Sequence, residues 1–235
     1  MKRAISHIAP APTSRCTPPP EPSRLTRADI PLATVDCAQF LIGMLLVRQL
    51  PDGTTVGGRI VETEAYAPGD PSSHAYRGPT RRTQVMFGAP LHAYVYLIYG
   101  MAWCFNVTTE REGIGAAVLV RAIEPSLGIA RIQRLRGAHI PERDLARGPG
   151  RLCSALDIGP ELNGIDLETD PRLWLADDGT RPALGASTRI GLTKAADVPH
   201  RYYARGSRYL SGPRVLSPPV SEILQPLAGA GKKKS

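Results

Sequence analysis

The stretch that most constrains the fold is AYVYLIYGMAWCFNVTT, residues 93–109. Its β-branched and aromatic residues favour a strand, and Tyr94 and Tyr96 are two residues apart, as on one face of a strand. Tyr99 follows after three residues and stands directly before a glycine, so the even spacing breaks there. We therefore expect the strand to end near Tyr99 in a turn, with most of the other aromatic residues in the core.

Further strands and helices are predicted around this stretch. The expected strands are MLLVRQL (44–50), TVGGRIVETEAY (55–66), GAAVLVRAIEP (115–125), TRIGLT (188–193) and RYYARGS (201–207). The expected helices are 34–42 with Thr34 as its cap, 127–137 from its apolar spacing, and a short helix opened by the glycine-rich turn in GPGRLCSALDI (148–158). Strands dominate the middle and helices flank it, which predicts a single mixed α+β domain.

The ends of the chain differ in composition from its middle. Residues 1–27 are rich in Pro, Ser and Thr, and residues 217–235 carry three lysines near their end, so we expect a disordered basic arm and a flexible basic tail around a folded domain at 28–216. There is no apolar segment of about 18 residues and no secretory signal, so we predict a cytoplasmic protein without a membrane span.

Charge and cysteine content narrow the function classes. The net charge of +8 and the isoelectric point near 9.6 favour a polyanionic partner, although part of the excess lies in the two tails. The four cysteines are scattered without metal-ligand spacing, so we predict no metal site and interpret Cys37, Cys104 and Cys153 as small core residues.

RIVETEAY (59–66) is the first stretch that suggests chemistry. In a strand Glu62, Glu64 and Tyr66 share one face. That face is either a solvated edge or a carboxylate beside an aromatic ring at the mouth of a cleft, where burial tunes a general base. His74, in the following loop SSHAYRG, is either incidental or part of the same pocket wall.

The ordered set of motifs resembles the alkyladenine (3-methyladenine, N-methylpurine) DNA glycosylase family. It comprises RIVETEAY, the histidine loop, MFG (86–88), YVYLIYGM (94–101), FNV (105–107), VLVRAIEP (118–125) and GPGRLC (148–153). The resemblance implies a curved antiparallel sheet and no cofactor. It also implies a monofunctional glycosylase of base excision repair that flips alkylated or deaminated purines out of duplex DNA.

Residue roles follow from the same resemblance. Glu64 matches the carboxylate that activates a water, and Arg121 matches the arginine that helps to hold the water and the carboxylate. Four further residues match the pocket that binds the flipped base: Tyr66, His74 and Tyr96 in its walls, and Asn106, which disfavours guanine.

Tyr99 and Met101 match the residues that enter the minor groove, and Arg151 matches a basic residue near a phosphate. Animal members of the family have an aromatic residue where this chain has Ala102, so we expect a smaller DNA-facing tip. The implied partner is double-stranded DNA with damaged purines, bound by a monomer.

Two other functions stay open at this point. One is a binding-only protein that recognises DNA damage without turnover, although pure binding would need neither Glu64 nor Arg121. The other is a basic nucleic-acid-binding protein whose strand motifs are purely structural.

Overall fold

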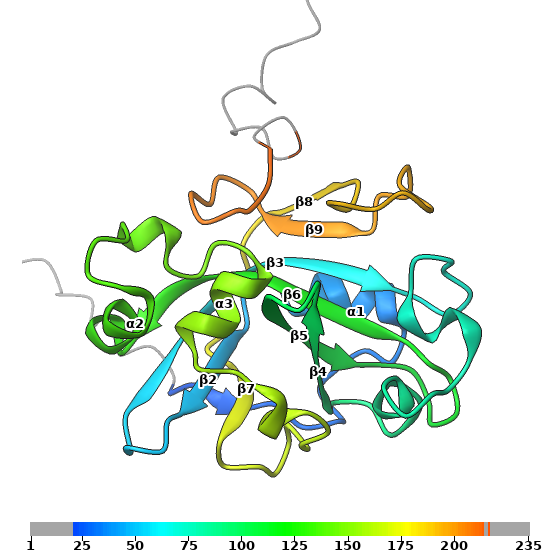
Figure 1. Cartoon of the computed structure of the whole chain (residues 1–235), viewed down its shortest axis with the longest axis horizontal. Helices are drawn as coiled ribbons and strands as arrows, with labels where there is room; N and C mark the ends of the chain where they lie inside the picture. The colour runs from blue at the N-terminus through cyan, green and yellow to red at the C-terminus, as the bar shows by residue number, and fades with distance from the viewer. Residues whose placement is uncertain (1–20, 214–215, 217–235) are drawn as a thin grey trace, which may run out of the picture.

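The computed structural model describes residues 21–213 and residue 216, and within them the chain forms one antiparallel sheet with helices around it (Figure 1). The strands are β1 (Ser23–Arg24), β2 (Leu45–Gln49), β3 (Thr55–Tyr66), β4 (Ala93–Ile98), β5 (Ala102–Thr108), β6 (Ala117–Leu127), β7 (Leu173–Asp177), β8 (Leu184–Ser187) and β9 (Arg201–Ala204). The helices are α1 (Thr34–Phe40), α2 (Ile129–Arg136) and α3 (Pro149–Ala155), with 3₁₀ turns η1 (His74–Arg77), η2 (Gln84–Phe87), η3 (Glu142–Asp144) and η4 (Pro160–Leu162). The predicted α+β domain around an antiparallel sheet with flanking helices is confirmed.

The long strand β3 organises the sheet. The main strand order is β1-β7-β2-β3-β6-β5-β4, and β9 with its neighbour β8 also joins β3. Residues 55–59 of β3 pair with β2, whereas residues 62–64 pair with β9, so β3 changes partner along one edge. The register also shifts beside Glu62, where β3 pairs with β6. The stretch that carries the two glutamates therefore lies between β6 and β9 in the middle of the sheet.

The helices cover the sheet from two sides. Figure 1 shows α3 in front of the central strands and α1 behind them. On the α1 side Thr63 donates a hydrogen bond to the Ala38 carbonyl at 2.8 Å. Residues alternate faces along a strand, so the flanking glutamates of β3 point to the other side, where α3 lies. Apolar side chains between these layers form the main core.

Several predicted boundaries needed correction. The expected strand at 188–193 is a loop, and β8 lies just before it. Thr34 is the first residue of α1 and not its cap, because its backbone N–H and its hydroxyl both bond the Glu110 carboxylate, at 2.8 and 2.6 Å. This carboxylate lies 76 positions away in the chain, so no local pattern could reveal it.

The folded body begins earlier than residue 28, where we expected it. Ser23–Arg24 pairs with β7, and Leu25 is buried in the core. The rest of the predicted arm, residues 1–20, and the predicted tail, 217–235, lie outside the described residues. No helix in the described part of the chain is long and apolar enough to cross a bilayer.

Candidate active site

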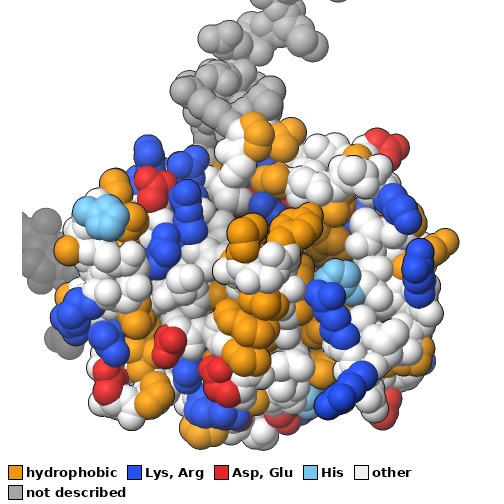
Figure 2. Space-filling model, in the orientation of Figure 1, with side chains coloured by type: hydrophobic (Ala, Val, Ile, Leu, Met, Phe, Trp, Pro, Cys, Tyr) orange, Lys and Arg blue, Asp and Glu red, His pale blue; other side chains and the backbone are white. Residues whose placement is uncertain are grey.

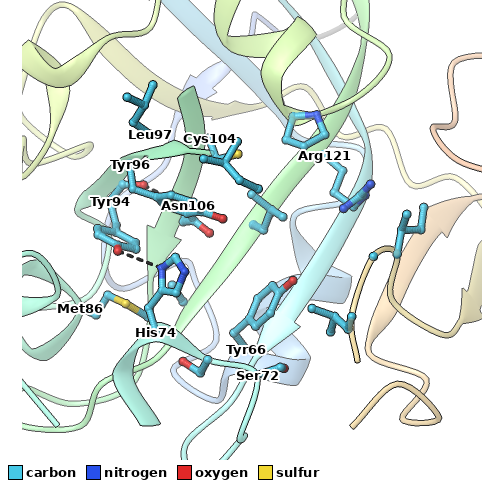
Figure 3. A pocket seen from close by; sticks show the side chains of 18 of the residues that line it. Tyr66, Ser72, His74, Met86, Tyr94, Tyr96, Leu97, Cys104, Asn106 and Arg121 are labelled. Carbon is cyan, nitrogen blue, oxygen red and sulfur yellow. Dashed lines mark hydrogen bonds between the residues drawn. The ribbon is translucent and has the colours of Figure 1, made fainter. Parts of the chain in front are cut away.

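A pocket of about 350 Å³ opens on the α3 side of the sheet, within the range of about 300–1,000 Å³ that is usual for small-molecule sites (Figures 2 and 3). Its walls come from the end of β3, the histidine loop, the β4–β5 hairpin, β6 and the loop after β8. They include Tyr66, Ser72, Ser73, His74, Arg82, Met86, Tyr94, Tyr96, Tyr99, Cys104, Asn106, Leu119, Arg121, Pro149, Ile190, Gly191 and Leu192. Six of the nine predicted site residues therefore meet in one pocket.

Glu64 is fully buried and lies directly behind this wall. One oxygen of its carboxylate accepts the Ile190 backbone N–H at 2.8 Å. The other accepts the Tyr66 hydroxyl at 2.9 Å and lies 3.2 Å from Nη1 of Arg121. All three partners line the pocket, so only these residues separate the Glu64 carboxylate from the cavity. The alternative of a solvated edge-strand face is wrong.

Arg121 joins the two glutamates of β3. Its Nε donates to Glu62 at 3.1 Å while Nη1 faces Glu64. Burial lowers the pKa of this guanidinium, but the two carboxylates outweigh burial and the pKa ends above its usual value. Glu62 also accepts bonds from Nε of Arg201, at 2.8 Å, and from the Ser211 hydroxyl, at 2.9 Å. Arg121 is thus a buried ion-pair partner and a pocket residue at once.

Aromatic side chains form opposite walls of the pocket, with Tyr66 on one side and His74, Tyr94 and Tyr96 on the other (Figure 3). The His74 and Tyr96 ring centroids are 4.6 Å apart, and Nδ1 of His74 is 3.1 Å from the Tyr94 hydroxyl. Burial, together with the nearby charge of Arg82, lowers the pKa of His74. Burial raises the pKa of both Tyr66 and Tyr96, so these two side chains stay neutral and apolar toward the cavity.

Asn106 lies on β5 opposite Tyr94 and is nearly buried. Its side-chain N–H donates to the Tyr94 carbonyl at 3.0 Å, which fixes the amide across the strand pair. The residue lines the pocket between the aromatic walls, so the amide is rigid where a ligand would meet it.

The β4–β5 turn carries the predicted tip. Tyr99 has a positive φ of 49°, and Gly100 follows at 70°, so the chain reverses tightly and the Met101 N–H bonds the Ile98 carbonyl at 3.0 Å. Tyr99 is 83% exposed and Met101 81% exposed. The predicted strand end and turn are confirmed. Two large apolar side chains are thus exposed at this turn.

Arg151 stands in the first turn of α3, with a half-exposed side chain 3.7 Å from Asp144. It lines a second hollow together with Arg136, Arg147 and Ala102. Figure 2 shows Lys and Arg side chains gathered over this part of the molecule, around α2 and α3. A basic cleft therefore adjoins the hairpin tip.

The residues that sequence reasoning missed come mainly from the loop after β8. Ile190 supplies the backbone N–H that holds Glu64, and Gly191 and Leu192 extend the same wall. These residues were missed because residues 188–193 were interpreted as a strand. A backbone N–H donor also cannot be recognised from the type of side chain. Tyr94 is not among the predicted site residues, but it lines the pocket and its hydroxyl hydrogen-bonds His74.

Cys37, Cys104 and Cys153 are buried as predicted, and Cys104 also lines the pocket. Among the described residues, no three His, Cys, Asp or Glu side chains come together as a metal site.

Comparisons with known proteins show the family to which the chain belongs. A family model described as methylpurine-DNA glycosylase matches residues 29–208. The chain belongs to this family. It is therefore a hydrolase that acts on N-glycosyl bonds, a DNA glycosylase in the repair of alkylated bases.

Relatives of this glycosylase are similar along most of their length. A protein of Mesorhizobium japonicum is 51% identical over 193 residues, which cover 82% of this chain and 92% of the relative. One from Paraburkholderia phytofirmans is 46% identical over 211 residues, covering 89% and 95%. One from Methanoculleus marisnigri is 50% identical over 183 residues, covering 76% and 93%. Each is provisionally named a 3-methyladenine DNA glycosylase.

Proposed function

We propose that this glycosylase removes alkylated or deaminated purines from duplex DNA by base flipping and attack of a Glu64-activated water. The substrate class comprises 3-methyladenine, 7-methylguanine, hypoxanthine and ethenoadenine. The main observation in support is that a single pocket is lined both by the exposed Tyr99 and by the residues that bond the buried Glu64.

Tyr99 and Met101 are proposed to enter the minor groove and to occupy the space that the flipped nucleotide leaves. Flipping costs a few kcal/mol, and less for a damaged, poorly paired base. An apolar side chain inserted between base steps offsets part of that cost. Both side chains are already exposed on a tight turn, so insertion requires no unfolding.

The flipped purine would lie between Tyr66 on one side and His74 with Tyr96 on the other. An electron-poor, cationic purine is attracted to aromatic faces. The lowered pKa of His74 keeps this ring uncharged at neutral pH, so it does not repel such a base. Asn106, whose amide is fixed by its bond to the Tyr94 carbonyl, is proposed to crowd the 2-amino group of guanine.

The chemical step is a displacement at the anomeric carbon. A water held by Glu64 and Arg121 attacks C1′, its proton passes to the carboxylate, and the C1′–N bond breaks with the electron pair leaving on the base. Departure of a cationic purine neutralises it, so no acid is needed for that substrate. No lysine matches a Schiff-base nucleophile in the motifs, which supports a monofunctional enzyme without strand cleavage.

The test uses duplexes that carry 3-methyladenine, hypoxanthine or 1,N6-ethenoadenine, with the undamaged duplex as control. Alkali cleaves the abasic sites, and the amount of cleaved strand measures release. We expect release from at least one damaged duplex and none from the control. Lesion-selective binding without release would support the binding-only alternative, and binding without selectivity would refute both.

We further propose that the protein acts as a monomer on DNA. In this arrangement we expect Arg151 and the basic cleft beside the β4–β5 turn to contact phosphates of the DNA backbone. Sedimentation of the protein with and without duplex checks the stoichiometry, and two protein copies on a duplex with one lesion would refute the monomer.

A further inference from the structure

A buried ion pair lies behind the pocket on the side of Tyr66. Arg189, in the loop after β8, pairs with Asp70, in the loop after β3, and the Arg189 side chain is fully buried. Neither residue lines the pocket. Burial raises the pKa of Asp70, but the bonds from Arg189 and Ser72 outweigh it, and the pKa ends below its usual value. Asp70 is therefore held as a carboxylate, and neither side chain of the pair reaches the cavity.

Arg189 contacts one of the three groups that hold Glu64 and is the chain neighbour of a second. Its guanidinium carbon lies 4.9 Å from the centroid of the Tyr66 ring, whose hydroxyl bonds Glu64. The next residue in the chain is Ile190, whose N–H bonds the other oxygen of the same carboxylate. Arg189 also donates to the Ala65 carbonyl at 2.9 Å, between Glu64 and Tyr66 in the strand. One side chain therefore fixes the loop after β8 against the end of β3.

Asp70 extends this arrangement to the histidine loop. The carboxylate oxygen that does not face Arg189 accepts the Ser72 N–H at 2.9 Å and the Ser72 hydroxyl at 2.6 Å. Ser72 and His74 both line the pocket. The ion pair thus connects the two loops that form the pocket's walls on either side of Tyr66.

The bonding of Arg189 is not the best one for stability alone. Its Nε is buried and has no hydrogen-bond partner among the described residues, although a buried donor usually has one. The centre of the guanidinium lies over the face of Tyr66, and a cation on an aromatic face is attracted to it. The geometry favours placement of the tyrosine ring over full hydrogen bonding.

We propose that Arg189, held by Asp70, is a positioning residue that aligns the Tyr66 hydroxyl and the Ile190 amide on Glu64 for the attack of water. This rests on the role proposed above for Glu64. The competing interpretation is an ion pair that only stabilises the fold. If Arg189 positions these groups, its substitution changes the rate constant of the chemical step. If the ion pair only stabilises the fold, the substitution changes the fraction of folded protein.

Single-turnover excision separates them, because the rate constant reports the chemical step and the amplitude reports the folded, active fraction. Arg189→Met removes the charge and the bonds but keeps an apolar chain of similar length. Arg189→Lys keeps the charge for Asp70 and loses the planar guanidinium with its several donors. The control is Arg59→Met, which breaks a different and less buried Arg–Asp pair, between Arg59 of β3 and Asp178 at 2.6 Å; neither residue contacts Glu64.

We expect Arg189→Met to lower the rate constant about 10- to 100-fold, because small misplacements of reacting groups have effects of that size. Binding to the lesion duplex should stay within about threefold of the unmodified protein, and Arg189→Lys should be intermediate. Arg59→Met should keep the rate constant. A loss of amplitude alone in the Arg189 variants, or equal rate constants in all three variants, would overturn the proposal.

If Arg189→Met does not fold, the rate constants of Arg189→Lys and Asp70→Asn decide by the same criterion. A reduced rate constant with full amplitude supports positioning, and an unchanged one refutes it. Failure of the proposed function is a separate result, because then the unmodified protein would release no base from any damaged duplex.

Discussion

Replacement of Glu64 by glutamine tests the assignment of the catalytic carboxylate most directly. The substitution keeps the size and shape of the side chain and removes only its charge and its capacity to take a proton. Glu62 offers a matched control, because it lies on the same strand, is equally buried and bonds the same Arg121.

The structure indicates how much stability each substitution removes. In Glu64→Gln the single carbonyl oxygen can keep the Ile190 N–H, and the Tyr66 hydroxyl can turn to accept the new amide N–H. Only the contact with Arg121 is lost, and Arg121 keeps Glu62, so we expect about 1.5–3 kcal/mol, the range for one bond to a charged group. Glu62→Gln loses a carboxylate that serves both Arg121 and Arg201, so about 3–5 kcal/mol is expected.

For the rate of catalysis we expect the reverse order, with the larger loss in Glu64→Gln and the smaller loss in Glu62→Gln. Without a base at 64, the single-turnover rate constant for hypoxanthine release should fall about 10²- to 10⁴-fold, while binding to the lesion duplex is retained. Glu62→Gln should have the smaller rate loss and the larger loss in urea-measured unfolding free energy. A Glu64→Gln enzyme within about threefold of the normal rate would refute the assignment, and so would rate losses that follow stability in both variants.

Three further predictions concern the tip, the basic cleft and the pocket wall. Tyr99→Ser should slow excision from duplex DNA but not from a single strand, with little change in Tm because the side chain is exposed; equal slowing on both substrates would contradict a wedge. Arg151→Met should lower the slope of log K against log salt concentration by about 1, and an unchanged slope would remove Arg151 from the phosphate contacts. The pKa of His74 is lowered in the folded protein, so the unfolded chain binds the proton more readily and stability should fall as the pH drops below about 6.5. His74→Gln should weaken this dependence of Tm on pH, and parallel curves for the two proteins would contradict it.

Strands with a regular pattern could be predicted from the sequence, because alternation and turn residues act locally. The break at Tyr99 correctly marked the end of β4, since a positive φ there forces a reversal of the chain. The shared face of Glu62 and Glu64 followed from the period of two. Their complete burial did not, because it depends on β9 and on Ser211, which are more than 130 positions away in the chain.

The loop after β8 shows why the rest of the site could not be predicted. Its apolar residues suggested a strand, but residues 62–64 of β3 already pair with β9, and β8 pairs with β9 on the far side. The segment 188–193 is therefore left to cross the end of β3, where Arg189 and Ile190 meet Tyr66 and Glu64. Which strands pair with β3 and β9 determines that residues 188–193 form a loop. That pairing involves segments far apart in the chain, so the sequence of 188–193 alone does not reveal it.

The arrangement of charges explains how a fully buried carboxylate is kept in place without depending on the substrate. Glu62, Glu64, Arg121 and Arg201 balance as two negative and two positive charges in one cluster. Glu62 bonds both arginines, so Arg121 would stay positioned even if Glu64 turned toward a water. Glu64 shares only one contact with this cluster and takes its other two bonds from the pocket wall. The carboxylate with the fewest ion-pair contacts is therefore the one next to the cavity, an arrangement that supports the role of general base proposed for Glu64.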